Sequence, residues 1–193
     1  MLRLKSMPHR ALTILVLASA LFLTACQTSV HPNTGRAADS ATTARDAGYA
    51  LLYSTIGQEC DVDKVLIIKS PAPAVSDLVK AIGQFARDAK ATMENLSRED
   101  PPITLDNQGL PEVETTTREA IGSTTSRQIL FHGGKDLEFR LLLTQHEALN
   151  YITHLAASVA DHEPRDNRRR YLGQLSTQSD ALHERVLSLL KTP

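Results

Sequence analysis

The chain has no tryptophan, and aromatic side chains of any kind make up only 4% of its 193 residues. Carbohydrate-binding surfaces stack sugar rings on aromatic side chains, so this composition argues against such a surface. Enzyme signatures are also missing, because the sequence contains no Gly-x-Ser-x-Gly and no cysteine pair with zinc-site spacing. The motifs therefore give no indication of catalysis.

Cysteine is scarce as well, and the longest apolar run lies near the amino terminus. Residues 11–25 are all apolar or small, and the ten residues before them carry Arg3, Lys5 and Arg10 with no acidic residue. A positive segment followed by a short apolar run is typical of a secretory signal peptide. The run is too short to cross a bilayer comfortably, since a transmembrane helix needs about 20 apolar residues.

One of the two cysteines stands directly after this run. The sequence Leu23-Thr24-Ala25-Cys26 resembles the lipobox of bacterial lipoproteins, in which a branched apolar residue and two small residues precede an obligatory cysteine. The resemblance implies that residues 1–25 are removed, that the Cys26 thiol receives a diacylglycerol and that the new amino terminus is acylated. Two or more acyl chains suffice for stable anchoring in a membrane.

The residues after Cys26 indicate where the protein is anchored. Gln27 follows the cysteine rather than aspartate, which by analogy with lipoprotein sorting implies the outer membrane, facing the periplasm. The following residues are mostly small or polar, without apolar periodicity, so we interpret residues 26–40 as a lipidated flexible tether. Residues 41–193 are the predicted folded domain.

Removal of residues 1–25 leaves 18 Lys and Arg against 22 Asp and Glu, a net charge of −4. This balance argues against a nucleic-acid partner. If Cys26 is lipidated, Cys60 has no intramolecular partner. Cys60 lies in a helical pattern beside Ile56 and Val62, so we interpret it as a small buried apolar residue rather than a reactive thiol.

The rest of the chain is patterned for helices, with apolar residues at three- and four-residue steps and no segment of useful length with a period of two. Helices are predicted over residues 42–69, 74–99, 111–162 and 167–191. The third is interrupted near Gly133-Gly134. Short loops between long helices produce antiparallel neighbours, so the sequence predicts an all-α, up-and-down bundle of four main helices.

Such bundles often hold metal ions between their helices, and the predicted domain loosely resembles ferritin-like four-helix bundles. The Glu-x-x-His pairs of that family are absent. The third predicted helix carries His146 beside the candidate ligands Glu147 and His154, and the last predicted helix carries His183 and Glu184. Carboxylates and imidazoles suit a transition metal, although such residues also simply border apolar stripes. The candidate ligands are Glu59, Asp63, Glu147 and His154.

One basic cluster begins the last predicted helix and consists of Arg165, Arg168, Arg169 and Arg170. Positive charge at the start of a helix opposes the macrodipole, so stability does not require it there. The cluster is therefore a candidate binding site for anionic headgroups, lipopolysaccharide phosphates or peptidoglycan carboxylates. The alternative is a solvated helix face balanced by neighbouring acidic residues.

Two functions remain open at this point. The first is a non-enzymatic, membrane-anchored lipoprotein whose bundle binds another envelope component, such as a protein, and needs no cofactor beyond its covalent lipid. The second is a ferritin-like periplasmic bundle that binds or oxidises a transition metal.

Overall fold

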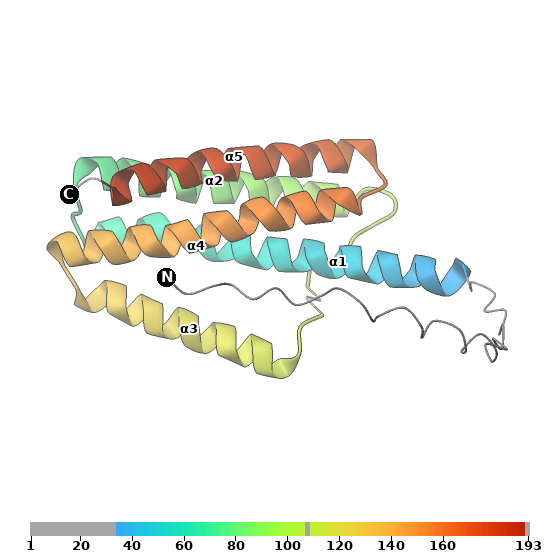
Figure 1. Cartoon of the computed structure of the whole chain (residues 1–193), viewed down its shortest axis with the longest axis horizontal. Coiled ribbons are helices and arrows are strands. Elements are labelled where there is room, and N and C mark those ends of the chain that lie inside the picture. The colour runs from blue at the N-terminus through green and yellow to red at the C-terminus, as the bar shows by residue number, and fades with distance from the viewer. Residues whose placement is uncertain (1–33, 107–108, 192–193) are drawn as a thin grey trace, which may run out of the picture. The chain divides into compact units, whose positions relative to one another are not determined.

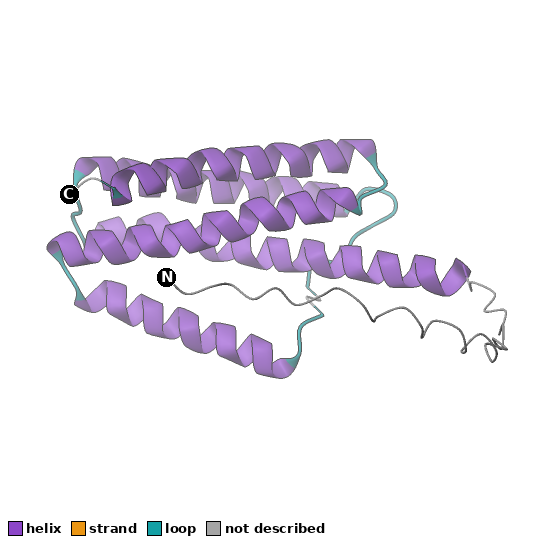
Figure 2. Ribbon diagram, viewed as in Figure 1, coloured by secondary structure: helices purple, strands orange, loops and turns teal. Residues whose placement is uncertain are grey.

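The structure is a computed structural model that describes residues 34–106 and 109–191, with side chains from residue 43 onwards. This part of the chain consists of helices joined by loops and contains no strand (Figure 2). The prediction of an all-helical domain is confirmed. Over the same residues, no helix combines the length and the apolar character needed to span a membrane.

Five α-helices and one 3-10 segment follow one another, each α-helix running against its predecessor (Figure 1). The prediction of four main helices is not confirmed, because the third predicted helix, interrupted near Gly133-Gly134, forms two separate helices. Gly134 has a φ of +57°, in the left-handed region that glycine adopts readily, and the chain reverses there. The elements are α1 (Thr34–Glu59), η1 (Val62–Ile67), α2 (Pro73–Ser97), α3 (Glu112–Phe131), α4 (Gly134–Asp161) and α5 (Asp166–Leu190).

The first helix also differs from its predicted bounds. α1 begins at Thr34, inside the segment interpreted as a tether, and ends at Glu59. The apolar pattern that continues to residue 69 belongs to η1, a 3-10 helix with no fully buried side chain. Helical periodicity alone does not distinguish an α-helix from a 3-10 continuation over six residues.

Prolines lie at several helix boundaries. Pro73 occupies the first turn of α2, where a missing N–H leaves no hydrogen bond unmade. Pro111 precedes α3, and the acidic Glu112 and Glu114 in its first turn favour the positive end of the macrodipole. Pro164 follows the end of α4. These boundaries agree with the prediction to within a few residues.

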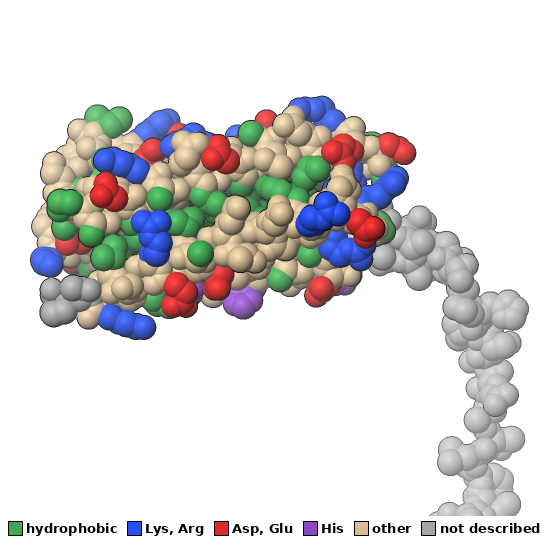
Figure 3. Space-filling view, turned by 90° about the horizontal axis from the view of Figure 1, so that it is seen from above, with side chains coloured by type: hydrophobic (Ala, Val, Ile, Leu, Met, Phe, Trp, Pro, Cys, Tyr) green, Lys and Arg blue, Asp and Glu red, His purple; other side chains and the backbone are tan. Residues whose placement is uncertain are grey.

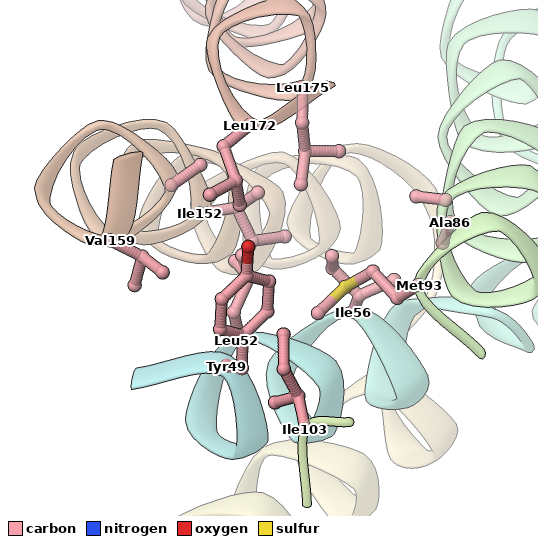
Figure 4. Packing of buried hydrophobic residues seen from close by; sticks show 12 residues of the cluster. Tyr49, Leu52, Ile56, Ala86, Met93, Ile103, Ile152, Val159, Leu172 and Leu175 are labelled. Atoms are coloured by element: carbon pink, nitrogen blue, oxygen red, sulfur yellow. The ribbon is translucent and has the colours of Figure 1, made fainter. Parts of the chain in front are cut away.

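Side chains from α1, α2, α4 and α5 share the hydrophobic core, and Figure 4 shows its larger cluster. A second cluster joins α2, α4 and α5, where Val62, Val65 and Leu66 of η1 pack against it. The larger cluster contains Tyr49, Leu52, Ile56, Ala86, Ala89, Met93, Ile103, Ile152, Ala156, Val159, Leu172 and Leu175.

α3 lies beside α4 (Figure 1) and has no buried side chain. Ile129 packs against the second cluster, and the Arg118 guanidinium lies 5.6 Å from the ring centroid of Tyr151 on α4. Nη1 of Arg140 on α4 donates a hydrogen bond to Oε1 of Gln128 at 3.2 Å. α3 is thus attached to the bundle rather than built into its core.

Candidate functional site

The four residues predicted to bind metal do not converge. Glu59 is buried at the end of α1 with 8% exposure, and Asp63 lies on η1. Glu147 and His154 are both exposed on α4. In the described ranges, no group of three or more potential ligands includes any of these four residues.

Glu59 faces Gln145 of α4, whose side chain donates a hydrogen bond to it. Burial raises the pKa of the Glu59 carboxyl, and the hydrogen bond from Gln145 opposes this increase. The Oε1 atom of Gln145 is buried and has no hydrogen-bond partner. A protonated carboxyl has an O–H to offer this oxygen, whereas a carboxylate only accepts. The pair therefore suits a neutral Glu59 better than a charged one.

Asp63 ties η1 to α2. Nη2 of Arg87 on α2 lies 3.1 Å from Oδ2 of Asp63, and Nη1 donates to the carbonyl oxygen of Cys60 at 2.7 Å. The hydrogen bond from Arg87 lowers the pKa of the Asp63 carboxyl. Cys60 itself packs half-buried against the larger core cluster, and burial raises the pKa of its thiol. A raised thiol pKa accords with a packing role rather than a reactive one.

A pair of histidines joins α4 to α5. Nε2 of His183 lies 2.6 Å from Nδ1 of His146, and the two ring centroids are 4.6 Å apart. His183 is only 8% exposed, and this burial, together with His146, lowers its pKa. Gln145 and His146 are consecutive but contact different helices, because successive side chains on an α-helix point about 100° apart.

Two carboxylates accompany His183 on α5. Ligand atoms of Asp180, His183 and Glu184 all lie within 4.8 Å of one another. Asp180 precedes His183 by three residues, so the two side chains lie on the same side of the helix. That spacing was the signal available in the sequence for Asp180. The pairing of His146 with His183 could not be predicted, because it depends on how α4 and α5 are aligned.

The arginine cluster divides between core and surface. Arg168 is fully buried, and its Nη2 donates hydrogen bonds to the carbonyl oxygens of Leu96, Glu99 and Pro101 at 2.9, 2.6 and 2.8 Å. These carbonyls lie at and just beyond the end of α2, where a cation complements the negative end of the macrodipole. Arg168 thus stabilises the end of a neighbouring helix.

The other three arginines of the cluster are exposed. Arg165 lies 3.9 Å from Asp100, and Arg169 forms an ion pair with Asp166. Arg170 is exposed on the same helix. Exposed ion pairs of this kind contribute little to stability. Because Arg168 is buried, only three of the four predicted arginines are available to an anionic ligand.

Large apolar side chains are exposed on a limited part of the molecule. Phe131 is 84% exposed and Ile67 81%. The described parts of α1, α2 and α5 carry no such side chain. The face seen in Figure 3 shows Lys, Arg, Asp and Glu spread over its length, with hydrophobic side chains visible between them. We call the following eight exposed residues the apolar surface: Ile67, Ile68, Val113, Ile121, Leu130, Phe131, Phe139 and Leu143.

Two hydrogen bonds hold together the segments that carry most of the apolar surface. Nζ of Lys69 donates to the carbonyl oxygen of His132 at 2.8 Å, and the Ala72 amide donates to Oε1 of Glu138 at 2.6 Å. The end of η1 therefore lies beside the connection between α3 and α4. Figure 1 places this connection at the opposite end of the bundle from the start of α1.

The predicted cleavage position after Ala25 and the predicted lipidation site Cys26 lie outside the described residues. Comparison with models of known protein families, with curated proteins and with solved structures gives no match. The function must therefore be argued from the residues of this chain alone.

Proposed function

We propose that the chain is a membrane-anchored periplasmic lipoprotein, without catalytic activity, that binds another protein of the cell envelope. The observation that carries this proposal is the apolar surface on α3, the first turns of α4 and the end of η1. Large apolar side chains exposed on neighbouring segments, as at the end of η1 and around the connection from α3 to α4, are typical of protein interaction sites. Covering them with a partner is favourable by about 25 cal/mol per Å² of apolar area.

The membrane anchor is proposed from the lipobox. Cys26 carries the lipid, residues 1–25 are removed, and Gln27 directs the protein to the outer membrane. α1 begins eight residues after Cys26. An extended chain spans at most about 3.6 Å per residue, so the start of α1 stays within roughly 30 Å of the membrane surface.

The chemistry of α3 favours a protein as the partner over a lipid or a nucleic acid. One face of α3 is formed mainly by uncharged residues, among them Val113, Ala120, Ile121 and Thr124. Glu112 lies at the start of this face, and Nη2 of Arg127 donates a hydrogen bond to Oγ1 of Thr124 at 3.5 Å. Phosphate groups are bound by clusters of Lys and Arg, whereas the residues that line this face include neither and Arg127 lies only at its edge. The connection from α3 to α4, beside which part of the apolar surface lies, is at the opposite end of the bundle from the start of α1 (Figure 1).

The composition of α3 indicates that packing against a partner would stabilise this helix more than the others. Its 20 residues include five Thr, two Ser and one Gly, which are weak helix formers, and none of its side chains is buried. Most helices in proteins are stabilised by packing of an apolar face rather than by propensity. We propose that α1, α2, α4 and α5 form an up-and-down bundle that presents α3 to the partner.

Photocrosslinking in the native envelope tests the interaction. A photoreactive amino acid is placed at Phe131 or Ile121 of the full chain, with a control at Gln174, which is exposed on α5. We expect one discrete adduct from Phe131 and from Ile121, and none from Gln174. Failure of both test positions to give an adduct, or an equal adduct from the control, contradicts the proposed surface.

Acyl labelling tests the anchor separately. A Cys26→Ala chain should lose labelled palmitate and leave the membrane fraction, whereas Cys60→Ala should keep both. A Cys26→Ala chain that remains acylated overturns the anchor but leaves the interaction proposal standing.

A further inference from the structure

We propose that His146 and His183 are ligands of a divalent transition-metal ion bound between α4 and α5, with Asp180 and Glu184 completing the site. These four residues lie outside the apolar surface, so the proposal is independent of the proposed function. It differs from the metal site expected from the sequence, since none of Glu59, Asp63, Glu147 and His154 belongs to it.

The two imidazole nitrogens face each other at a distance close to the one that a shared ion requires. Nδ1 of His146 and Nε2 of His183 face each other at 2.6 Å, shorter than the usual range for a hydrogen bond from nitrogen, which starts at about 2.7 Å. A tetrahedral zinc ion lies about 2.0–2.1 Å from each imidazole nitrogen, which sets the two nitrogens roughly 3.3 Å apart. The rings need to separate by only roughly 0.7 Å to admit it.

Asp180 and Glu184 offer the further ligand atoms and the negative charge that two neutral imidazoles do not supply. Ligand atoms of both carboxylates lie within 4.8 Å of a ring nitrogen of His183. A carboxylate near a metal-bound histidine either binds the ion or accepts the N–H of the other ring nitrogen and fixes the ring. Two carboxylates also balance the charge of a divalent cation. Because both are exposed, they give the ion a route from solvent to the buried His183.

The donor set indicates which metals the site takes. Imidazole nitrogen and carboxylate oxygen without thiolate suit Zn²⁺, Co²⁺, Ni²⁺ or Cu²⁺. Mg²⁺ prefers an all-oxygen environment. The ion would connect α4 to α5, and since it binds only the folded chain it would stabilise the fold.

Zinc binding by the full chain tests the proposal. The protein is purified in detergent without a histidine tag, stripped with a chelator and titrated with Zn²⁺ by calorimetry. We expect about one zinc per chain, a melting temperature that rises with Zn²⁺ and not with Mg²⁺, and at least about tenfold weaker zinc binding in His146→Ala. The control is His154→Ala, which removes an exposed histidine from the same helix. This variant should bind zinc like the wild type.

A second variant protects the test against misfolding. Because Asp180 and Glu184 are exposed, the double variant Asp180→Asn/Glu184→Gln should keep the wild-type circular dichroism spectrum and still bind zinc more weakly. Co²⁺ should give visible absorption bands in the wild type that are lost in His146→Ala. The proposed site is overturned if the wild-type chain binds no zinc at micromolar concentrations, or if the His146→Ala chain binds zinc equally well. His146 and His183 then form only a hydrogen bond between α4 and α5.

Discussion

Glu59 places a carboxyl group in the core against Gln145, and burial raises its pKa. A carboxyl with a raised pKa in the folded state stabilises the fold fully below its unfolded-state pKa. That contribution is lost as the pH rises through the folded-state pKa. Glu59→Gln should therefore increase the free energy of unfolding at pH 7 by roughly 1 kcal/mol, because the new amide has an N–H to donate to Oε1 of Gln145. Urea unfolding measures the difference.

The pH dependence identifies the cause of that gain. At pH 4 the wild-type Glu59 is itself protonated, so the advantage of Glu59→Gln should shrink. Glu147→Gln, the same change at an exposed position on α4, should alter stability by less than about 0.5 kcal/mol at either pH. A Glu59→Gln variant that is less stable at pH 7 would show that the core requires the carboxylate.

Arg168 is also buried, and its positively charged guanidinium stabilises the end of α2. Arg168→Met keeps most of the apolar stem but removes the guanidinium that donates to three carbonyl oxygens near the end of α2. The Leu96 oxygen keeps the hydrogen bond from the Glu99 amide. We expect a loss of about 3 kcal/mol in urea unfolding. Arg169→Met is the matched surface control and should cost less than about 0.5 kcal/mol. Similar effects of the two substitutions would refute the structural role of Arg168.

At the scale of the helices, α1 and α4 approach closely at one point. A Cβ added at Gly48 would lie 2.8 Å from Cγ2 of Val159, whereas one added at Gly57 meets nothing within 4 Å in the described structure. Gly48→Ala should destabilise the protein by about 1–3 kcal/mol through overpacking. Gly57→Ala on the same helix should stabilise it by roughly 0.5–1 kcal/mol. Melting temperatures of the Gly48→Ala and Gly57→Ala variants test the close approach of α1 and α4. Effects of the same sign in both variants would contradict this close approach.

α3 should be the least stable helix of the isolated protein, because it has no buried side chain and a composition poor in helix formers. Hydrogen exchange should show amides of α3 exchanging faster than those of α4. Gly122→Ala, at a position with open space around it, should slow exchange in α3 while leaving that of α4 unchanged. Protection of α3 equal to that of α4 in the wild type would contradict its loose attachment.

The helices themselves could be predicted from the sequence, because apolar residues at three- and four-residue steps and the prolines near residues 71, 101, 111 and 164 act locally. The number of helices could not. A glycine pair such as Gly133-Gly134 is compatible with either a kink or a reversal, and the φ of Gly134 decides between them. Sequence periodicity also did not distinguish the end of α1 from η1.

The site residues show the same limit. Arg168 was expected at the surface because a cation opposes the dipole of its own helix, but its partners are carbonyls at the end of α2. His146 and His183 were identifiable as polar residues near apolar stripes, yet their contact depends on the register between α4 and α5. Long-range pairings of this kind are not encoded in local spacing.

At the scale of the whole molecule, the protein consists of a scaffold and a proposed interaction surface. Helices α1, α2, α4 and α5 contribute the core, and the apolar surface lies on α3 and the adjoining end of the molecule. If this surface binds a protein partner, as we propose, it can be altered without loss of the fold.

The double variant Ile121→Ser/Phe131→Ser tests the proposed binding of a protein partner. Both side chains are exposed, so the melting temperature of the purified chain should change little. Chemical crosslinking in the native envelope should recover a protein partner with the wild-type chain. We expect the double variant to lose that partner and the control Gln174→Ser/Gln178→Ser on α5 to retain it. Full recovery of the partner with Ile121→Ser/Phe131→Ser would contradict the proposed binding.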